Sequence, residues 1–374
     1  MAAPVCKSAD YKLTSLDDIE SNTAYLGDAS EKNWVSSGVP VAYNDEAVLL
    51  TMAPDTVGTL LMSTHYVWYG KMSATMTTSQ GQGVVTAFIM MSDVKDEIDF
   101  EFVGVDLESA QSNYYWQGVT DYDNGKALTT SNTVSEAHTY TIDWQPDYIS
   151  WAIDGKVGRT VQKKDTYNST DNKYHFPQTP SRVQLSLWPA GLPSNGNGTI
   201  TWAGGLIDWD SQYMQNGYYY AQVKEVSVEC YDPPSDTTKT GDEAYYYLNS
   251  EGLEQSVAIG NNNTILGSML ADGENPDFKP KSKTSGGSKP TSTPETVPGI
   301  SGGGSQQIGG QQAGNGGSGS GNSPSGSAPA DSSPTQVGGT TSFEQGNGSM
   351  SEASTVYAGS AVALLGFFVA ALML

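Results

Sequence analysis

The chain has 374 residues, with 18 basic and 41 acidic side chains and therefore a formal net charge of −23. No basic surface is available to neutralise phosphates, so we expect no nucleic-acid partner. An acidic surface repels anionic polymers as well, whereas a neutral polymer such as a polysaccharide is not excluded.

The composition divides the chain unevenly. All eight Trp lie before residue 235, and beyond about residue 280 the chain is mainly Gly, Ser, Pro, Thr, Gln and Asn. One folded domain is therefore expected over 21–235, because this length can bury a sizeable core. A short segment, 1–20, precedes it, and an extension, 236–279, follows it.

The first residues, MAAPVCKSAD, show neither the basic nor the apolar region of a secretory leader, so we expect this end to be incomplete. Cys6 and Cys230 lie near the two ends of the expected domain. They form either a disulfide, which requires an extracellular setting, or two free buried thiols. The three His are scattered and no Cys/His cluster exists, so we expect no metal site and no cofactor.

Short alternating apolar runs, separated by Gly, Asn, Asp or Pro, predict an all-β domain. Asp154-Gly155 after the run ISWAI predicts a hairpin turn. Runs at this spacing are typical of a sandwich or barrel, and we expect two packed antiparallel sheets with a concave face that forms a groove. The runs are 47–52, 84–91, 139–144, 149–153, 182–188 and 222–229.

The segment DEIDFEFV, residues 96–103, alternates acidic and apolar residues. In a strand, Glu97, Asp99 and Glu101 share one face, while the apolar residues between them pack in the core. A solvated surface strand is the simplest alternative. However, three acids about 7 Å apart oppose one another electrostatically, so the pattern is costly unless function requires it. No calcium-loop spacing is present.

Two carboxyls about 5–5.5 Å apart are what a retaining glycosidase requires. Glu97 and Glu101 can reach this separation if their side chains lean together, although their Cα atoms are about 13 Å apart. Asp99 between them favours one ionised and one protonated Glu. The strand therefore predicts a nucleophile and an acid in different protonation states.

The C-terminal part predicts attachment to a membrane. Residues 280–349 are too polar to fold and are expected to form a flexible stalk. Residues 350–374 contain an uncharged apolar run with no basic residue after it. Small residues, spacer and apolar tail indicate a GPI-attachment signal, with Asn347 as the expected site and a tail-anchored helix as the alternative. Sequons at Asn168, Asn197 and Asn262 agree with secretion.

DEIDFEF resembles the ExDxE signature of glycoside hydrolase family 16. Together with HYVWYGKM, QSNYYWQG, YTIDW, SWAIDGK, FPQTPSRVQLSLWPAG and TWAGGLIDW, it resembles the fungal Crh family of cell-wall chitin–glucan transglycosylases. The resemblance implies a β-jelly-roll catalytic domain over 21–235. It also implies Glu97 as nucleophile, Glu101 as acid/base and Asp99 as assisting carboxylate.

Sugar rings stack on aromatic faces, and their hydroxyls need fixed polar partners. We expect substrate contacts from Asn113, Tyr114, Trp116, Gln184, Trp188 and Trp202. By family analogy, the face of RVQLSLW that bears Gln184 and Trp188 lines the groove, although a single Trp is more often a packing residue.

The resemblance implies a retaining transglycosylase that cleaves a β-1,4-linked chitin donor and transfers it to β-glucan acceptors. Hydrolysis of β-glucan is the alternative, because the same carboxylates serve both reactions. A non-catalytic polysaccharide-binding wall protein is the third candidate. The expected location is extracellular, in the cell wall and on the plasma membrane through a GPI anchor.

Overall fold

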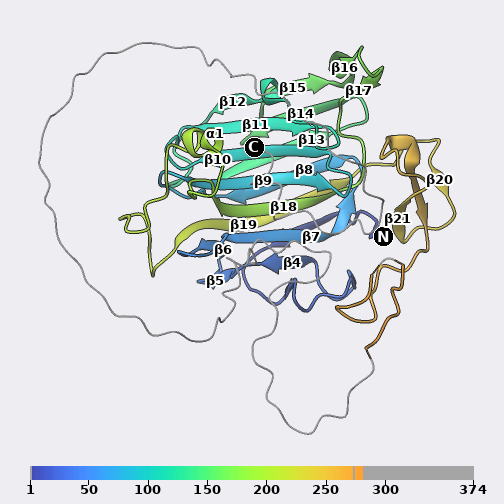
Figure 1. The fold of residues 1–374 in the computed structure, drawn as a ribbon, viewed down its shortest axis with the longest axis horizontal. Helices are drawn as coiled ribbons and strands as arrows, with labels where there is room; N and C mark the ends of the chain where they lie inside the picture. Colours follow the sequence, from blue (N-terminus) through green and yellow to red (C-terminus); the bar gives the residue numbers. More distant parts are fainter. Residues whose placement is uncertain (1, 273, 281–374) are drawn as a thin grey trace, which may run out of the picture. The chain divides into compact units, whose positions relative to one another are not determined.

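The computed structural model describes residues 2–272 and 274–280, and these residues form a β-sandwich of two large, mainly antiparallel sheets (Figure 1). The expected all-β sandwich is confirmed. The expected stalk from residue 281 onward, the apolar tail and Asn347 lie outside the described residues.

The first sheet contains the acidic strand. Its eight strands are, in spatial order, β12 (Lys126–Thr129), β11 (Ser109–Tyr115), β10 (Glu97–Val103), β9 (Val84–Ser92), β18 (Ser181–Pro189), β7 (Thr59–Val67), β4 (Trp34–Ser37) and β3 (Ile19–Ser21). The acidic strand is therefore flanked on both sides, by β9 and β11, so that side chains from several strands share its face.

The second sheet covers the apolar face of the first. Its strands are, in spatial order, β15 (Lys156–Gln162), β14 (Tyr148–Ile153), β13 (His138–Trp144), β8 (Gly70–Met76), β19 (Tyr219–Cys230), β6 (Ala47–Met52) and β5 (Val41–Tyr43), with β2 (Ala9–Lys12) also paired to β19. All six expected runs are strands. Asp154 and Gly155 have φ values of 50° and 77°, which confirms the tight turn between β14 and β15.

Smaller elements complete the described part. They are a sheet of β1 (Ala3–Pro4), β21 (Ala244–Tyr247), β22 (Val257–Gly260) and β20 (Thr238–Lys239), a hairpin of β16 (Tyr167–Asn168) and β17 (Lys173–Tyr174), the helix α1 (Asn197–Trp202), and the 3₁₀ turns η1 (Tyr122–Asn124), η2 (Lys163–Thr166) and η3 (Glu254–Ser256). No helix among residues 2–272 and 274–280 has the length and apolar character needed to cross a membrane.

The core lies between the two large sheets. Ile98, Phe100 and Phe102 of β10 are buried there in the main cluster, and the rings of Phe100 and Phe102 pack on Tyr140 of the second sheet, with centroids 5.5 and 4.5 Å away. Because alternate residues of a strand point to opposite faces, burial of this apolar set directs the three acids away from the core.

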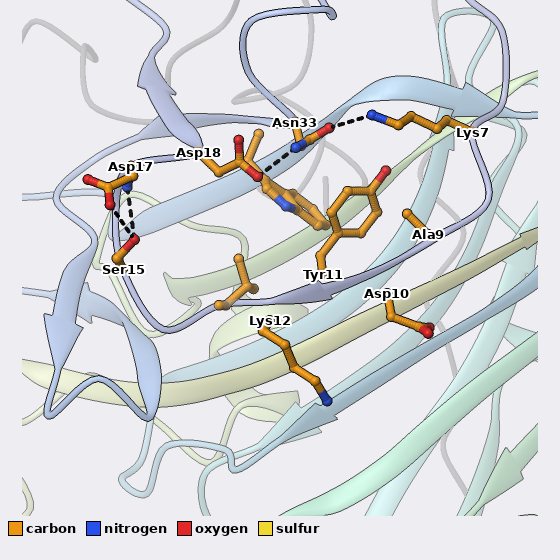
Figure 2. Close-up of a pocket in the computed structure, with 11 residues that line it drawn as sticks. Lys7, Ala9, Asp10, Tyr11, Lys12, Ser15, Asp17, Asp18 and Asn33 are labelled. Atoms are coloured by element: carbon orange, nitrogen blue, oxygen red, sulfur yellow. Dashed lines mark hydrogen bonds between the residues drawn. The ribbon is translucent and has the colours of Figure 1, made fainter.

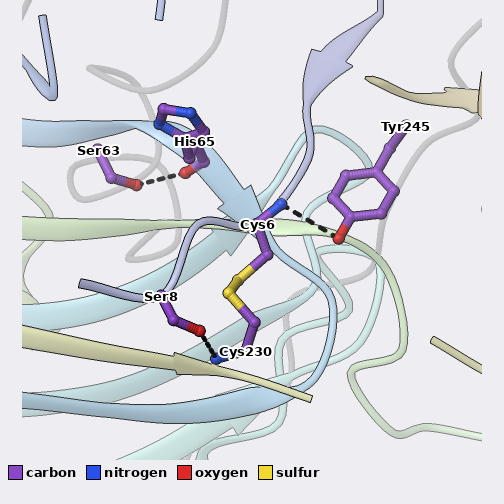
Figure 3. Close-up of a disulfide and its surroundings, with 6 residues drawn as sticks. All are labelled: Cys6, Ser8, Ser63, His65, Cys230 and Tyr245. Atoms are coloured by element: carbon purple, nitrogen blue, oxygen red, sulfur yellow. Dashed lines mark hydrogen bonds between the residues drawn. A yellow bond between two sulfur atoms is a disulfide. The ribbon is translucent and has the colours of Figure 1, made fainter. Parts of the chain in front are cut away.

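The structure contains a disulfide between Cys6 and Cys230, with their Cα atoms 6.0 Å apart (Figure 3). Of the two alternatives that the sequence left open, the structure has the bridge. The backbone N–H of Cys6 donates to the Tyr245 hydroxyl at 3.3 Å, and Tyr245 packs edge-to-face on Trp68 of the main core.

The segments on both sides of the expected domain also join this core. β1 pairs with β21, so the N-terminal residues and the extension share one small sheet. Val257 and Ile259 of β22 belong to the main buried cluster. The boundaries at residues 20 and 235 remain a prediction, since the chain on either side of each packs into the same interior.

The expected glycosylation asparagines within the described residues lie in different settings. Asn197 and Asn262 are exposed, at the start of α1 and after β22 respectively. Asn168 is half-buried in β16, where its side-chain oxygen accepts a hydrogen bond from the Thr170 backbone at 2.8 Å. Glycosylation of all three remains a prediction.

Candidate active site

Glu97, Asp99 and Glu101 lie along one face of β10, directed away from the core. Although they do not enter the sandwich interior, Glu97 is only 7% exposed and Asp99 only 1% exposed, while Glu101 is half-buried. A solvated surface strand would expose such side chains. The acids are therefore recessed below the surrounding surface.

The strand register places side chains from the neighbouring strands beside each acid. On one side, β11 sets Tyr115, Asn113 and Gln111 opposite Glu97, Asp99 and Glu101 respectively. On the other side, β9 sets Met91, Ile89 and Ala87 opposite the same three residues. The carboxylate face is thus polar towards β11 and apolar towards β9.

Strand β18 continues the carboxylate face beyond β9. Arg182, Gln184 and Ser186 lie opposite Met91, Ile89 and Ala87, and Trp188 follows opposite Val85. Several polar atoms on this face are buried and have no hydrogen-bond partner: Asp99 Oδ1, Gln184 Nε2, Ser186 Oγ and Trp188 Nε1. Unpaired buried polar atoms are costly in a folded protein, and a cluster of them on one face is typical of a site that binds a polar ligand.

Trp188 and Trp202 stack on each other, with ring centroids 6.2 Å apart and an interplanar angle of 27°. The Trp202 indole nitrogen donates to the Gln111 side-chain oxygen at 2.8 Å. Since Gln111 is directly opposite Glu101, helix α1 brings this aromatic pair to the Glu101 end of the carboxylate face.

Two of the expected contact residues do not belong to this face. Tyr114 lies opposite Ile98 and packs in the core beside Trp151, at 6.5 Å between ring centroids. Trp116 is buried and stacks on His175, with ring centroids 4.4 Å apart. By the two-residue period of β11, both positions belong to the set that alternates away from the carboxylate face. By contrast, Asn113, Gln184, Trp188 and Trp202 lie on or beside the carboxylate face.

Tyr115 and Gln111 are members of this face that the sequence reasoning missed. The Asn113 side-chain nitrogen donates to the Tyr115 hydroxyl at 2.7 Å, and burial, followed by the charges of the three acids, raises the pKa of that hydroxyl. Strict alternation from Asn113 along QSNYYW would have selected these two residues in place of Tyr114 and Trp116.

The three acids share protons. Burial, followed by the charge of Glu101, raises the pKa of Glu97 to about 8. Burial raises the pKa of Glu101 to about 7. For Asp99, burial and then the charges of Glu101 and Glu97 raise the pKa well above its usual value, while Arg159 opposes them. Burial thus favours protonation within the row, so β10 carries fewer than three negative charges near neutral pH.

Asp96 fixes the beginning of the acidic strand. Its buried carboxylate accepts hydrogen bonds from the Gln117 backbone at 3.0 Å, the Gln178 backbone at 2.9 Å and the Thr179 hydroxyl at 2.7 Å. Burial raises the pKa of Asp96 to about 6 even so. The first acid of DEIDFEF is thus a structural anchor that holds the loop after β11 and the loop before β18 at the Glu97 end of β10.

A separate cavity of about 410 Å³ lies beside the N-terminal strand β2. It is lined by side chains from residues 7–18 together with Asn33 and Trp34, and none of the three β10 acids borders it (Figure 2). The Asn33 side chain bridges Asp18 and Lys7 there. Metal-ligating side chains do not gather into a candidate ion site anywhere in the described chain.

The model of glycosyl hydrolases family 16 matches residues 28–204, which include the acidic strand and α1. Crh-like protein 2 of Aspergillus fumigatus is 51% identical over 311 residues, which are 82% of this chain and 70% of that protein. The chain belongs to family 16 and, within it, to the Crh-like proteins.

Two further Crh-type relatives have similar identities. Crh-like protein 3 of Botryotinia fuckeliana is 57% identical over 273 residues, and Congo red hypersensitive protein 2 of Saccharomyces cerevisiae is 47% identical over 280 residues. These matches cover 73% and 74% of this chain but only 61% and 60% of those proteins, so the chain spans about three fifths of their length.

Solved structures of Crh5 transglycosylase share the fold. The apo form has a TM-score of 0.55 and 31% identity, over 68% of this chain and 94% of that chain. The form in complex with NAG has a TM-score of 0.56 with the same identity and coverage. The family 16 sandwich is therefore present in this chain.

Proposed function

We propose that this Crh-like chain is an extracellular transglycosylase that cleaves a β-1,4-linked chitin donor by a retaining double displacement and transfers it to a β-glucan acceptor. The row of Glu97, Asp99 and Glu101 on β10 is the observation that carries this proposal. It stands among buried polar atoms without protein partners, which suit the hydroxyls and amides of a sugar chain.

In the first step, the Glu97 carboxylate attacks the anomeric carbon of the donor while the Glu101 carboxyl gives its proton to the leaving glycosidic oxygen. An ester between the sugar and Glu97 results, and the leaving chain departs with the proton. In the second step, Glu101, now a carboxylate, takes the proton of an acceptor hydroxyl, whose oxygen attacks the same carbon and releases Glu97.

The proton distribution must change for this reaction. In the free protein burial raises the pKa of both Glu97 and Glu101, which favours the protonated form of each, whereas a nucleophile must be ionised. We infer that donor binding moves the shared proton towards Glu101, with Asp99 between the two as the relay and hydrogen-bond partner.

The relatives support the reaction type and the donor class. Crh5 is named a transglycosylase, and one of its structures holds NAG, which is in keeping with a chitin donor. The Cys6–Cys230 disulfide favours an oxidising, extracellular setting. Attachment through a GPI anchor at Asn347 is part of the proposal and rests on the sequence of the tail alone.

The experiment combines the purified chain with chitin oligosaccharides and a fluorescent β-glucan acceptor. The proposal predicts a fluorescent hybrid larger than the acceptor, absent with Glu97→Gln or Glu101→Gln. Glu108→Gln is the matched control, because it removes an exposed acid just after β10 and leaves the face intact. Free sugars without hybrid would favour the hydrolase, and binding without any product would favour the non-catalytic wall protein.

A further inference from the structure

A cation–aromatic pair lies on the core side of the acidic strand, opposite to the carboxylate face. Its members are Trp151 of β14 and Arg159 of β15. The Arg159 guanidinium carbon lies 4.6 Å from the centroid of the Trp151 ring. We propose that Arg159 is a positioning residue that, with Trp151, holds the backbone at Asp99 and supplies a fixed positive charge behind this middle acid. This inference rests on the proposed function, because it assigns a role to two residues that lie behind the same site.

A β-bulge creates the pairing. Trp151 lies opposite Arg159, whereas the next residue, Ala152, lies opposite Val157, so Gly158 is the extra residue of β15. A Cβ at Gly158 would lie 3.2 Å from the side chain of Leu128 in β12. A side chain at this position would require Leu128 to shift, and the bulge sets Arg159 opposite Trp151 with its guanidinium over the indole ring.

The guanidinium binds the strand next to the acids. Its Nη1 donates to the Ser112 carbonyl at 2.6 Å and the Ser112 hydroxyl at 3.0 Å, and its Nη2 donates to the Asn124 carbonyl at 2.5 Å. Ser112 is the core-side neighbour of Asn113, which is opposite Asp99. Arg159 thus fixes β11 at the position that faces the middle of the acidic row.

Trp151 fixes the acidic strand itself. Its indole nitrogen donates to the Asp99 carbonyl oxygen at 2.9 Å, across the interior of the sandwich. Because Arg159 stacks on this indole and binds β11 at the same time, the Trp151–Arg159 pair holds both strands at one level. A fixed backbone on both sides limits how far the Asp99 carboxylate can move.

Arg159 has no ion-pair partner among residues 2–272 and 274–280, where the ion pairs involve other cations. Asp99 is the carboxylate whose pKa it lowers, against the opposite effects of burial, Glu101 and Glu97. The groups packed around Asp99 are Glu97 and Glu101 on β10, Asn113 and Tyr115 on β11, the uncharged Ala87, Ile89 and Met91 on β9, and Arg159 and Trp151 from behind.

A purely structural role and a positioning role differ in what they do to Asp99. If Arg159 only stabilised the sandwich, its replacement would lower the melting temperature and leave the titration of the acids unchanged. If it supplies the charge behind Asp99, loss of the charge raises the pKa of this carboxyl, while Lys at the same position largely preserves it.

The test is a carboxyl-carbon NMR titration of the full chain, which needs no turnover and so does not depend on the proposed function. Arg159→Gln should move the titration of Asp99 upward by about 0.5–1 pH unit, and Arg159→Lys should leave it near that of the unmodified chain. Lys156→Gln, which removes an exposed charge from the same strand, should leave it unchanged. If Arg159→Gln does not fold, Arg159→Met keeps the apolar packing on Trp151 and tests the same loss of charge.

Activity adds a second readout. With chitin oligosaccharides as donor, the acidic limb of the pH profile of kcat/KM should move to higher pH by the same amount in the charge-free variant. The value of kcat should fall by roughly 10-fold. An unmoved Asp99 titration in the charge-free variant, or equal movement in the Lys156→Gln control, would overturn the inference. If the unmodified chain proves inactive on every glycan while the NMR shift is present, the proposed function fails and the inference about Asp99 stands.

Discussion

Trp202 donates a hydrogen bond from its indole nitrogen to the side-chain oxygen of Gln111, at 2.8 Å. Gln111 is directly opposite Glu101 in the ladder of β10 and β11. The bond joins a short helix, far along the chain, to the end of the acidic row where the proposed acid/base lies. It orients the Trp202 ring, which also stacks on Trp188.

Replacing Trp202 therefore tests whether this aromatic pair binds the sugar chain. Trp202→Phe keeps a ring but loses the donor to Gln111, and kcat/KM for transfer should fall about 3–10-fold. Trp202→Ala also loses the stacking surface and should lower kcat/KM by roughly 10–100-fold. Steady-state transfer kinetics with chitin oligosaccharides measure both.

Trp209→Phe is the matched control for these variants, since Trp209 packs on Tyr219 of the second sheet and not on the carboxylate face. Its kinetics should equal those of the unmodified chain. Full activity of Trp202→Ala would show that the Trp188–Trp202 stack only packs α1 onto the sheet.

Tyr115 tests the polar side of the carboxylate face. Its hydroxyl accepts from the Asn113 side chain, and burial keeps its pKa well above the usual value, so it stays a neutral hydrogen-bond donor at every pH of interest. Tyr115→Phe should lower kcat/KM about 10-fold while the melting temperature changes little. Tyr43→Phe, which changes an exposed tyrosine on β5 of the second sheet, is the comparison. Equal kinetics of the two variants would remove Tyr115 from the site.

The raised pKa values of the acids predict how stability depends on pH. An acid whose pKa is higher in the folded state than in the unfolded chain, about 4, binds its proton more tightly when folded. Its contribution is complete below about pH 4 and is lost as the pH rises towards the folded value, about 8 for Glu97. Glu97→Gln removes this loss.

Glu97→Gln should therefore raise the melting temperature at about pH 8 by roughly 2–4 °C, and have almost no effect near pH 4. Differential scanning calorimetry across this range measures the difference. The exposed Glu108→Gln should show no such pH dependence. A Glu97→Gln variant that is less stable than the unmodified chain at about pH 8 would contradict the burial-driven shift.

The disulfide closes a loop of 224 residues between the N-terminal segment and the end of β19. Cross-linking a long loop lowers the entropy of the unfolded chain, so reduction should cost about 2–5 kcal/mol of unfolding free energy. Urea unfolding with and without a reductant measures this. The double variant Cys6→Ala/Cys230→Ala should match the reduced chain and should not respond to reductant. Equal midpoints for the oxidised and reduced chains would contradict it.

The local pattern was sufficient for β10, because alternation alone separates Glu97, Asp99 and Glu101 from the apolar set. For β11 the expectation follows residue type instead of alternation, because the aromatic rings of Tyr114 and Trp116 suit sugar stacking. Tyr114 packs in the core and Trp116 stacks on His175, so neither lies on the carboxylate face, and the two-residue period is a better guide here than residue type. Tyr115 is the residue that the period selects.

Other features required tertiary structure. The pairing of Cys6 with Cys230 depends on the pairing of β2 with β19, which brings the N-terminal segment to the end of β19 and which no local signal encodes. The Trp151 bond to the Asp99 carbonyl joins residues 52 positions apart in different sheets. Gly158 shows the same limit: its bulge decides where Arg159 points, yet in sequence it is one glycine in an exposed strand.

The most direct test of the central claim, that Glu97 is the nucleophile and Glu101 the acid/base, is azide rescue with an aryl β-chitooligoside as donor. In Glu97→Ala, azide replaces the carboxylate, attacks from the α face and should give the α-glycosyl azide. In Glu101→Ala, the sugar still forms its ester with Glu97, and azide should then give the β-glycosyl azide. NMR of the two products assigns the anomers. The opposite pair of anomers would exchange the two roles, and the absence of rescue in both variants would contradict catalysis by this strand.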